Sequence, residues 1–113
     1  QAEALATENG GSLTITHDRG AALRDAHVVY AKSWGSLATW GNAEAESTQR
    51  APLRDWCVTE ASMPPQAHFM HCLPVRRNVI ATDAVLDGPN SLILEQAENR
   101  LHAQTALLET LLS

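Results

Sequence analysis

The sequence predicts an α/β fold, in which a parallel sheet carries helices on both faces. Short runs of apolar and β-branched residues alternate along the chain with segments that favour helix. A long helical pattern closes the chain. In the segment 68–78, an apolar run ends in a thiol, a proline and two adjacent arginines. Because open α/β sheets bind ligands at the carboxyl ends of their strands, this segment predicts a binding rim.

The first half is predicted to hold two helices, two strands and a long loop. The composition of residues 1–9 predicts a helix, which ends at a Gly-Gly pair. A β-branched run predicts a strand over 12–16, and a helix of one or two turns follows over 21–26. The apolar run 27–31 predicts a buried strand. Residues 32–53 show no clean period and are expected to form a loop, and loops of that length are usually functional or mobile.

The second half is predicted to alternate in the same way. A helical turn is expected over 59–63, because two prolines stop it, and a strand over 67–72. A Thr-Asp pair is expected to cap a short helix over 82–86, followed by an Asp-Gly-Pro-Asn turn. A short strand over 91–94 then leads into the clearest helix, 95–112, whose apolar positions recur every three to four residues.

Composition narrows the possible classes of function. The chain has 113 residues, enough for one domain, and a net charge of −5 without a basic cluster, which argues against nucleic-acid binding. No apolar run reaches the roughly 18 residues of a membrane span. No initiator Met or leader is present, so we expect a cytoplasmic protein and a chain that is part of a longer one. Two cysteines without a secretion signal are expected to remain free thiols.

No metal and no cofactor are expected. His68, His71 and Cys72 are close in sequence, but neighbouring strand residues face opposite ways, and no second pair stands at zinc spacing. The tryptophans around the long loop either line a cleft or pack in the core, and the sequence leaves both alternatives open. They are Trp34, Trp40 and Trp56.

Three motifs resemble one known family. They are His-Cys-Leu-Pro-Val-Arg-Arg-Asn at 71–78, Ala-Thr-Asp-Ala-Val-Leu-Asp-Gly-Pro at 81–89 and Glu-Asn-Arg-Leu-His-Ala-Gln at 98–104. In order and spacing they resemble the C-terminal part of the ornithine carbamoyltransferase superfamily. The resemblance implies that residues 1–113 are an N-terminally truncated C-terminal, ornithine-binding domain of a two-domain enzyme, without the carbamoyl phosphate domain. It also implies a homotrimer with active sites between subunits and, in the acylornithine branch, a chain knotted within this domain.

The resemblance also implies roles for residues of these motifs. Cys72 corresponds to a cysteine that contacts the δ-nitrogen of the ornithine moiety without forming a covalent intermediate, and the Leu73 carbonyl to one that accepts a hydrogen bond from the carbamoyl NH2. Arg100 corresponds to an arginine that contacts the carbamoyl oxygen. That role suits the chemistry, because attack on carbamoyl phosphate moves negative charge onto this oxygen and a fixed guanidinium stabilises it.

Lys32 indicates the acceptor. Ordinary ornithine carbamoyltransferases carry an Asp in this segment, facing the substrate's α-ammonium. A lysine there disfavours free ornithine, because two like charges about 4 Å apart repel by about 4 kcal/mol at an effective dielectric near 20. The stretch Tyr-Ala-Lys-Ser-Trp-Gly resembles the N-acetylornithine and N-succinylornithine carbamoyltransferases. Arg76 is our candidate for the α-carboxylate, with plain surface charge as the alternative, and His71 is grouped with the substrate-binding residues. Ile80, where N-acetylornithine enzymes often carry Lys, resembles the succinyl branch.

The predicted function is therefore transfer of a carbamoyl group from carbamoyl phosphate to the δ-amine of N-acetyl- or N-succinylornithine in arginine biosynthesis. The reaction needs no cofactor, because positioning and electrostatics supply much of the acceleration. Ornithine carbamoyltransferase is the nearest alternative, and Lys32 argues against it. Aspartate carbamoyltransferase has Pro where Cys72 stands. An inert carbamoyltransferase-like binding or assembly domain is the alternative of another class, and the 113-residue chain alone is expected to be inactive.

Overall fold

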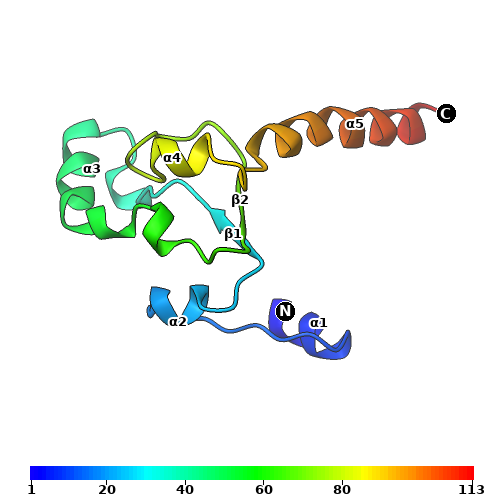
Figure 1. Cartoon of the computed structure of the whole chain (residues 1–113). Coiled ribbons are helices and arrows are strands. Elements are labelled where there is room, and N and C mark those ends of the chain that lie inside the picture. Colours follow the sequence, from blue (N-terminus) through cyan, green and yellow to red (C-terminus); the bar gives the residue numbers. More distant parts are fainter.

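The computed structural model describes residues 1–113 and has a two-stranded parallel sheet at its centre (Figure 1). Strand β1 (Val28–Ala31) pairs with β2 (His68–His71) in a register that runs from Val28 opposite His68 to Ala31 opposite His71. Parallel strands end at the same edge, so the residues that follow Ala31 and His71 emerge side by side. The predicted α/β class with a parallel sheet is confirmed.

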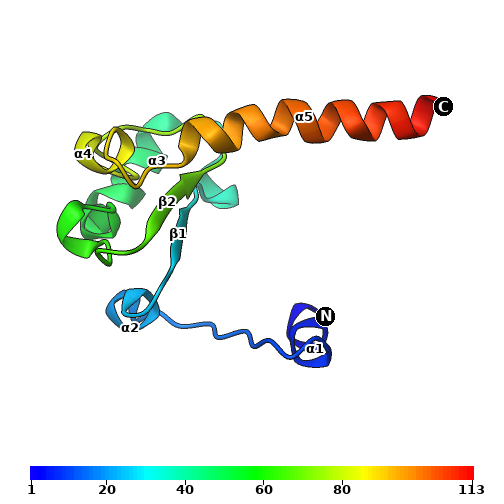
Figure 2. The same ribbon diagram turned by 45° about the vertical axis from the view of Figure 1, so that its right-hand side comes forward.

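Five α-helices and three 3-10 helices accompany the two strands. They are α1 (Ala2–Glu8), α2 (Arg19–Leu23), α3 (Ala43–Arg50), α4 (Asp83–Leu86) and α5 (Ile93–Leu112), with the 3-10 helices η1 (Leu37–Thr39), η2 (Ala51–Trp56) and η3 (Glu60–Ser62). Helices α3 and α4 lie on one side of the sheet, and α1 and α2 lie at its other end (Figure 1). Helix α5 follows α4 along the chain, begins beside β2 and projects outward to the C-terminus, as the turned view also shows (Figure 2). None of these helices is long and apolar enough to cross a membrane.

The core lies between the sheet, α4 and the start of α5. Phe69 is fully buried at its centre, and its backbone bonds to the segment before α5: its N–H donates to the Asn90 carbonyl at 2.8 Å, and its carbonyl accepts from the Leu92 N–H at 2.8 Å. Eight buried apolar residues form this core. They are Val29, Val58, Ala67, Phe69, Ala81, Val85, Leu86 and Ile93.

The turn around α4 follows the sequence closely. Thr82 caps the helix by accepting from the Val85 N–H, as predicted. Gly88 ends the segment, and a Cβ at this position would lie 2.5 Å from the Ala84 carbonyl oxygen, so only glycine fits without a shift. The turn therefore fixes the approach of α5 to β2.

Both ends of the chain stand away from the core. The radius of gyration is 16.9 Å, whereas a compact domain of this length has about 13 Å. In α5 only Ile93 is buried, while Leu101 and Leu112 are 65% and 84% exposed. The apolar stripe predicted for this helix is present but has no partner within the chain.

Three predicted elements are wrong. The 12–16 run forms no strand and is wholly exposed, because no neighbouring strand offers it hydrogen bonds. Residues 32–53 are not one loop: the Asn42 side chain accepts from the Ala45 N–H and begins α3 within them. The 91–94 run makes one bridge to β2 at Ser91 and then becomes the first turn of α5.

Other differences are smaller. Helix α2 begins two residues before the predicted 21–26 segment, because the Asp18 carboxylate accepts from the Ala21 N–H and caps it. In β1 only Val29 is buried, while Val28 and Tyr30 are about half exposed. The strand predicted as buried therefore has a covered face and an open face.

Candidate functional site

The carboxyl ends of the two strands bring Lys32 beside the segment His71-Cys72-Leu73. Ala31 pairs with His71, so Lys32 and Cys72 are the next residues out of the sheet. The positive charge of Lys32 acts on the His71 ring and contributes to lowering its pKa. Cys72 and Leu73 are half-buried, and Lys32 is exposed. Lys32, Cys72 and Leu73, which are all expected in the site, thus lie near one another at one edge of the sheet.

His71 lies beneath this edge. Its side chain is 1% exposed, and its Nδ1 accepts a hydrogen bond from the Leu73 N–H at 2.9 Å. Burial is the main cause that lowers the pKa of His71, with the Lys32 charge second, so the ring is neutral near pH 7 with its proton on Nε2. Nε2 is buried without a partner. His71 is expected to bind substrate. In this structure its ring accepts the hydrogen bond that holds the backbone of Leu73, whose φ is +51°.

A polar cluster holds the loop that follows. The Arg77 guanidinium binds both carboxylate oxygens of Asp87 and one of Asp83, each at 2.7 Å. Asn78, at φ +57°, donates to the Asp83 carboxylate at 2.8 Å and accepts from the Asp83 N–H at 3.1 Å. Hydrogen bonds from Arg77 hold the pKa values of both carboxyls below their ordinary range. We call Arg77, Asn78, Asp83 and Asp87 the loop latch.

The two adjacent arginines differ in their contacts. Arg77 binds Asp83 and Asp87, at the start of α4 and just after it. Arg76 is about half exposed and has one distant ion pair, at 3.8 Å from a Glu46 carboxylate oxygen. Of the two arginines, Arg76 is therefore the one whose guanidinium is less engaged within the chain.

A cavity of about 390 Å³ opens beside Arg76. Arg50 and Arg54 of α3 and η2 line it with Arg76, and Arg50 pairs with Glu46 at 2.7 Å. Sequence reasoning missed Arg50 and Arg54, because they lay in or next to a segment interpreted as loop. The available signal was Asn42 as a helix cap, with Glu44 and Glu46 in the first turn after it. The cavity is lined by Trp34, Ser47, Arg50, Ala51, Arg54, Arg76, Asn78 and Val79.

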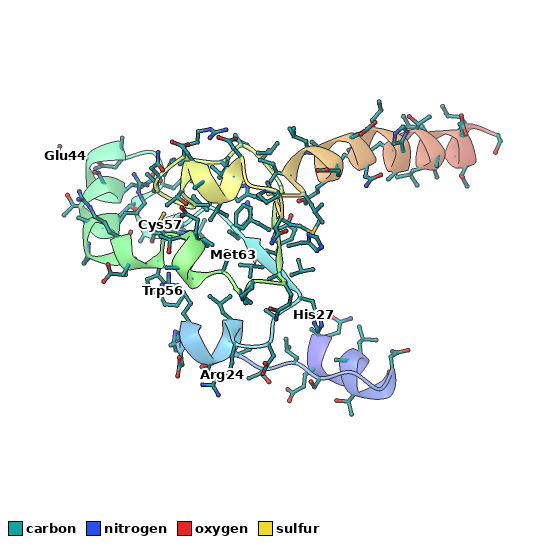
Figure 3. The ribbon with its side chains drawn as sticks, viewed as in Figure 1. Arg24, His27, Glu44, Trp56, Cys57 and Met63 are labelled. Carbon is teal, nitrogen blue, oxygen red and sulfur yellow. The ribbon has the colours of Figure 1, made fainter.

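The structure distinguishes the tryptophans that the sequence could not place. Trp34 lines the cavity, whereas Trp40 is 80% exposed. Trp56 points from η2 toward α2 (Figure 3), where the Arg19 guanidinium lies 5.9 Å from its ring centre. Trp56 therefore packs against α2 and takes no part in the strand-end site.

Arg100 lies on helix α5, outside the two strand-end segments. It is exposed on α5, and its guanidinium makes no hydrogen bond or ion pair within the chain. Four residues earlier, Gln96 donates to the Tyr30 hydroxyl at 2.9 Å and joins α5 to β1. Because residues four apart share a helix face, Arg100 continues the face that meets β1.

Three further residues complete the comparison with the sequence. Ile80 is 1% exposed, so packing accounts for its apolar character. Cys57 and Cys72 are free, as predicted. Burial raises the pKa of the Cys57 thiol, and the Arg19 charge opposes this. No three His, Cys, Asp or Glu side chains come together in a metal-binding arrangement.

Comparison with known proteins adds a family. Residues 1–111 match the family model of the aspartate/ornithine carbamoyltransferase Asp/Orn-binding domain. N-acetylornithine carbamoyltransferase of Xanthomonas axonopodis pv. citri is 49% identical over 108 residues, which cover 94% of this chain and 32% of the relative. Ornithine carbamoyltransferase of Pyrococcus abyssi is 44% identical, covering 98% of this chain and 35% of the relative.

Solved structures agree. Ornithine carbamoyltransferase from Pyrococcus furiosus superposes with a TM-score of 0.83 at 44% identity, covering 95% of this chain and 34% of that one. An acetylornithine transcarbamylase complexed with acetylcitrulline gives 0.78 at 49% identity, covering 90% and 31%. This chain therefore spans about a third of the length of the relatives it matches.

Proposed function

Because the chain belongs to the aspartate/ornithine carbamoyltransferase family and matches its Asp/Orn-binding domain, we propose that it is the acceptor-binding part of a carbamoyltransferase. The enzyme transfers the carbamoyl group of carbamoyl phosphate to the δ-amine of an N-acylated ornithine in arginine biosynthesis. Most of the carbamoyl phosphate site lies in a second domain, and the whole protein is a trimer. The relatives cover about three times the length of this chain, which supports the two-domain proposal.

The observation that carries this proposal is Lys32 beside the His71-Cys72-Leu73 segment. A cation at the strand ends suits an acceptor that presents only its carboxylate there. Free ornithine also carries an α-ammonium, which the Lys32 charge repels. Acylation of the α-nitrogen removes that positive charge, so an N-acylated ornithine keeps the attraction without the repulsion.

The proposed reaction uses each residue in turn. Lys32 and Arg76 hold the α-carboxylate, and Cys72 contacts the δ-nitrogen. The neutral δ-amine attacks the carbamoyl carbon, the bond from that carbon to the phosphate oxygen breaks, and phosphate leaves with the bonding pair. The departing phosphate then accepts the extra proton of the amine, which leaves a neutral ureido group. The Leu73 carbonyl accepts from the carbamoyl NH2, and Arg100, unpaired on α5, meets the charge on the carbamoyl oxygen.

The test is an assay of ureido product with the full-length protein, carbamoyl phosphate and three acceptors in parallel. These are ornithine, N-acetylornithine and N-succinylornithine. Turnover of an acylated acceptor with little on ornithine supports the proposal. Preference for free ornithine contradicts the Lys32 argument and favours ornithine carbamoyltransferase. Absence of any turnover favours the inert-domain alternative.

The chain alone is the matched control. The 113-residue chain is expected to show no turnover with any acceptor, because most of the carbamoyl phosphate site is proposed to lie outside it. Turnover by this chain would contradict the proposed division into two domains and leave the family membership unaffected.

A further inference from the structure

The cavity beside Arg76 concentrates positive charge. Arg50, Arg54 and Arg76 all line it. The one carboxylate paired with any of them is Glu46, at 2.7 Å from Arg50 and 3.8 Å from Arg76. Three guanidinium groups against one carboxylate leave two positive charges without a partner. We call this space the arginine cavity.

The arginine cavity adjoins the strand-end site. One wall comes from Trp34, two residues after Lys32, in the segment that leaves β1. Another comes from Arg76, Asn78 and Val79, in the segment that leaves β2. A ligand held at the carboxyl ends of both strands therefore borders this cavity. Its volume of about 390 Å³ falls within the range of small-molecule sites.

The chemistry of the walls selects the ligand. A guanidinium group presents paired N–H donors that match a carboxylate, and the charge strengthens both bonds. An acetyl group is neutral and draws no benefit from two unpaired positive charges. A dicarboxylic acyl group carries a free carboxylate at its far end, which neutralises one of them and reduces the repulsion between the arginines.

We propose that the arginine cavity binds the terminal carboxylate of a succinyl group carried on the α-nitrogen of the ornithine acceptor. This inference rests on the proposed function, since it names the acyl group of the same substrate. Lys32 and Arg76 then hold the α-carboxylate, while Arg54, with Arg50 beside it, holds the second carboxylate.

Arg54 offers the cleanest test. Arg50 and Arg76 both pair with Glu46, so replacing either disturbs contacts within the chain. Arg54 makes no side-chain hydrogen bond or ion pair, so Arg54→Gln removes charge from the cavity and leaves the fold intact. Arg24→Gln is the matched control, because Arg24 is also exposed and unpaired but lies by α2, well away from α3 (Figure 3).

The experiment measures kcat and KM of the full-length protein and both variants. The acceptors are N-succinylornithine and N-acetylornithine, and the KM for carbamoyl phosphate is measured as well. We expect the unmodified protein to prefer N-succinylornithine. Arg54→Gln should lower kcat/KM for this acceptor by about ten- to a hundredfold, the effect of losing one charged hydrogen bond. It should hardly change the values for N-acetylornithine, and Arg24→Gln should change neither.

Each other result overturns the inference in its own way. Preference for N-acetylornithine, or an equal loss on both acceptors, refutes the succinyl assignment while carbamoyl transfer stands. A raised KM for carbamoyl phosphate in Arg54→Gln would show that the cavity serves the phosphate. Failure to carbamoylate any ornithine derivative would overturn both this inference and the proposed function.

Discussion

Replacing His71 with leucine separates the hydrogen bond at the strand end from the packing around it. Leucine is close to histidine in size, so it fills the buried space. It leaves the Leu73 N–H, which donates to Nδ1 at 2.9 Å, without an acceptor, at a cost of about 1–3 kcal/mol. It also removes Nε2–H, which is buried without a partner, and so recovers a cost of similar size. We therefore expect the free energy of unfolding to change by less than about 1 kcal/mol.

Activity should respond differently. Without the bond from its N–H, Leu73 no longer holds its carbonyl in a fixed direction, and this carbonyl is the one that we propose accepts from the carbamoyl NH2. Loss of one such interaction lowers kcat/KM by about tenfold or more. His71→Asn is the control, since its side-chain oxygen can stand near the place of Nδ1 and accept from Leu73. Asparagine should therefore retain most of the activity.

Urea unfolding and steady-state kinetics on the full-length protein check both halves of this prediction. The reasoning is refuted if asparagine lowers kcat/KM as far as leucine does, because the acceptor at Nδ1 would then be irrelevant. It is also refuted if leucine destabilises the protein by several kcal/mol, because packing would then dominate.

His71 should also make the free energy of unfolding depend on pH. Burial, and then Lys32, lower the pKa of His71 in the folded state below its ordinary value. The unfolded chain therefore takes up this proton first as pH falls. The stability associated with neutral His71 is fully present above about pH 6.5 and is lost as pH falls through the lowered value. His71→Leu should abolish this part of the pH dependence of unfolding.

Three further predictions concern Lys32, the loop latch and the core. Lys32→Asp should shift the ratio of kcat/KM toward free ornithine by about a hundredfold or more, because the α-ammonium then meets an opposite charge; an unchanged ratio would mean that Lys32 does not face this group. Arg77→Ala should remove the contribution that Asp83 and Asp87 make to the free energy of unfolding. This contribution is present above about pH 4 and is lost as pH falls through their lowered pKa values. Unfolding curves that coincide with those of the unmodified protein at every pH would contradict this. Phe69→Ala should destabilise the chain by about 3–5 kcal/mol, measured by urea unfolding, because its ring is fully buried; a loss under about 1 kcal/mol would place the core elsewhere.

Elements with strong local signals were predictable from the sequence. The runs that form β1 and β2 are mainly apolar and end where the residue types change. Thr82, as the N-cap residue, predicts where α4 begins. The strand-end position of Lys32 and Cys72 followed from these two strands and from the parallel arrangement. For these residues local preference and tertiary contacts agree, which is the condition under which sequence patterns are informative.

Elements that depend on distant partners were not predictable. The 12–16 run has strand-forming residues, but a strand needs a neighbour and the chain supplies none at that edge. The arginine cavity combines α3, η2 and the loop after β2, whose proximity no local pattern encodes. The bond between His71 and Leu73 is local, yet it depends on a buried ring orientation and on the positive φ of Leu73.

The distribution of charge explains how an acidic chain can suit acidic ligands. The net charge is −5, which alone would repel the anionic ligands that we propose. Four of the eight basic residues, however, gather at the strand ends and in the arginine cavity, and these are Lys32, Arg50, Arg54 and Arg76. Fields in a recessed site are set by nearby charges, because solvent and salt screen the distant ones within about 8 Å. The positive charges of these four residues therefore outweigh the net charge of the chain at this place. Raising the ionic strength should weaken binding of the proposed acceptor, even though the chain as a whole is negatively charged.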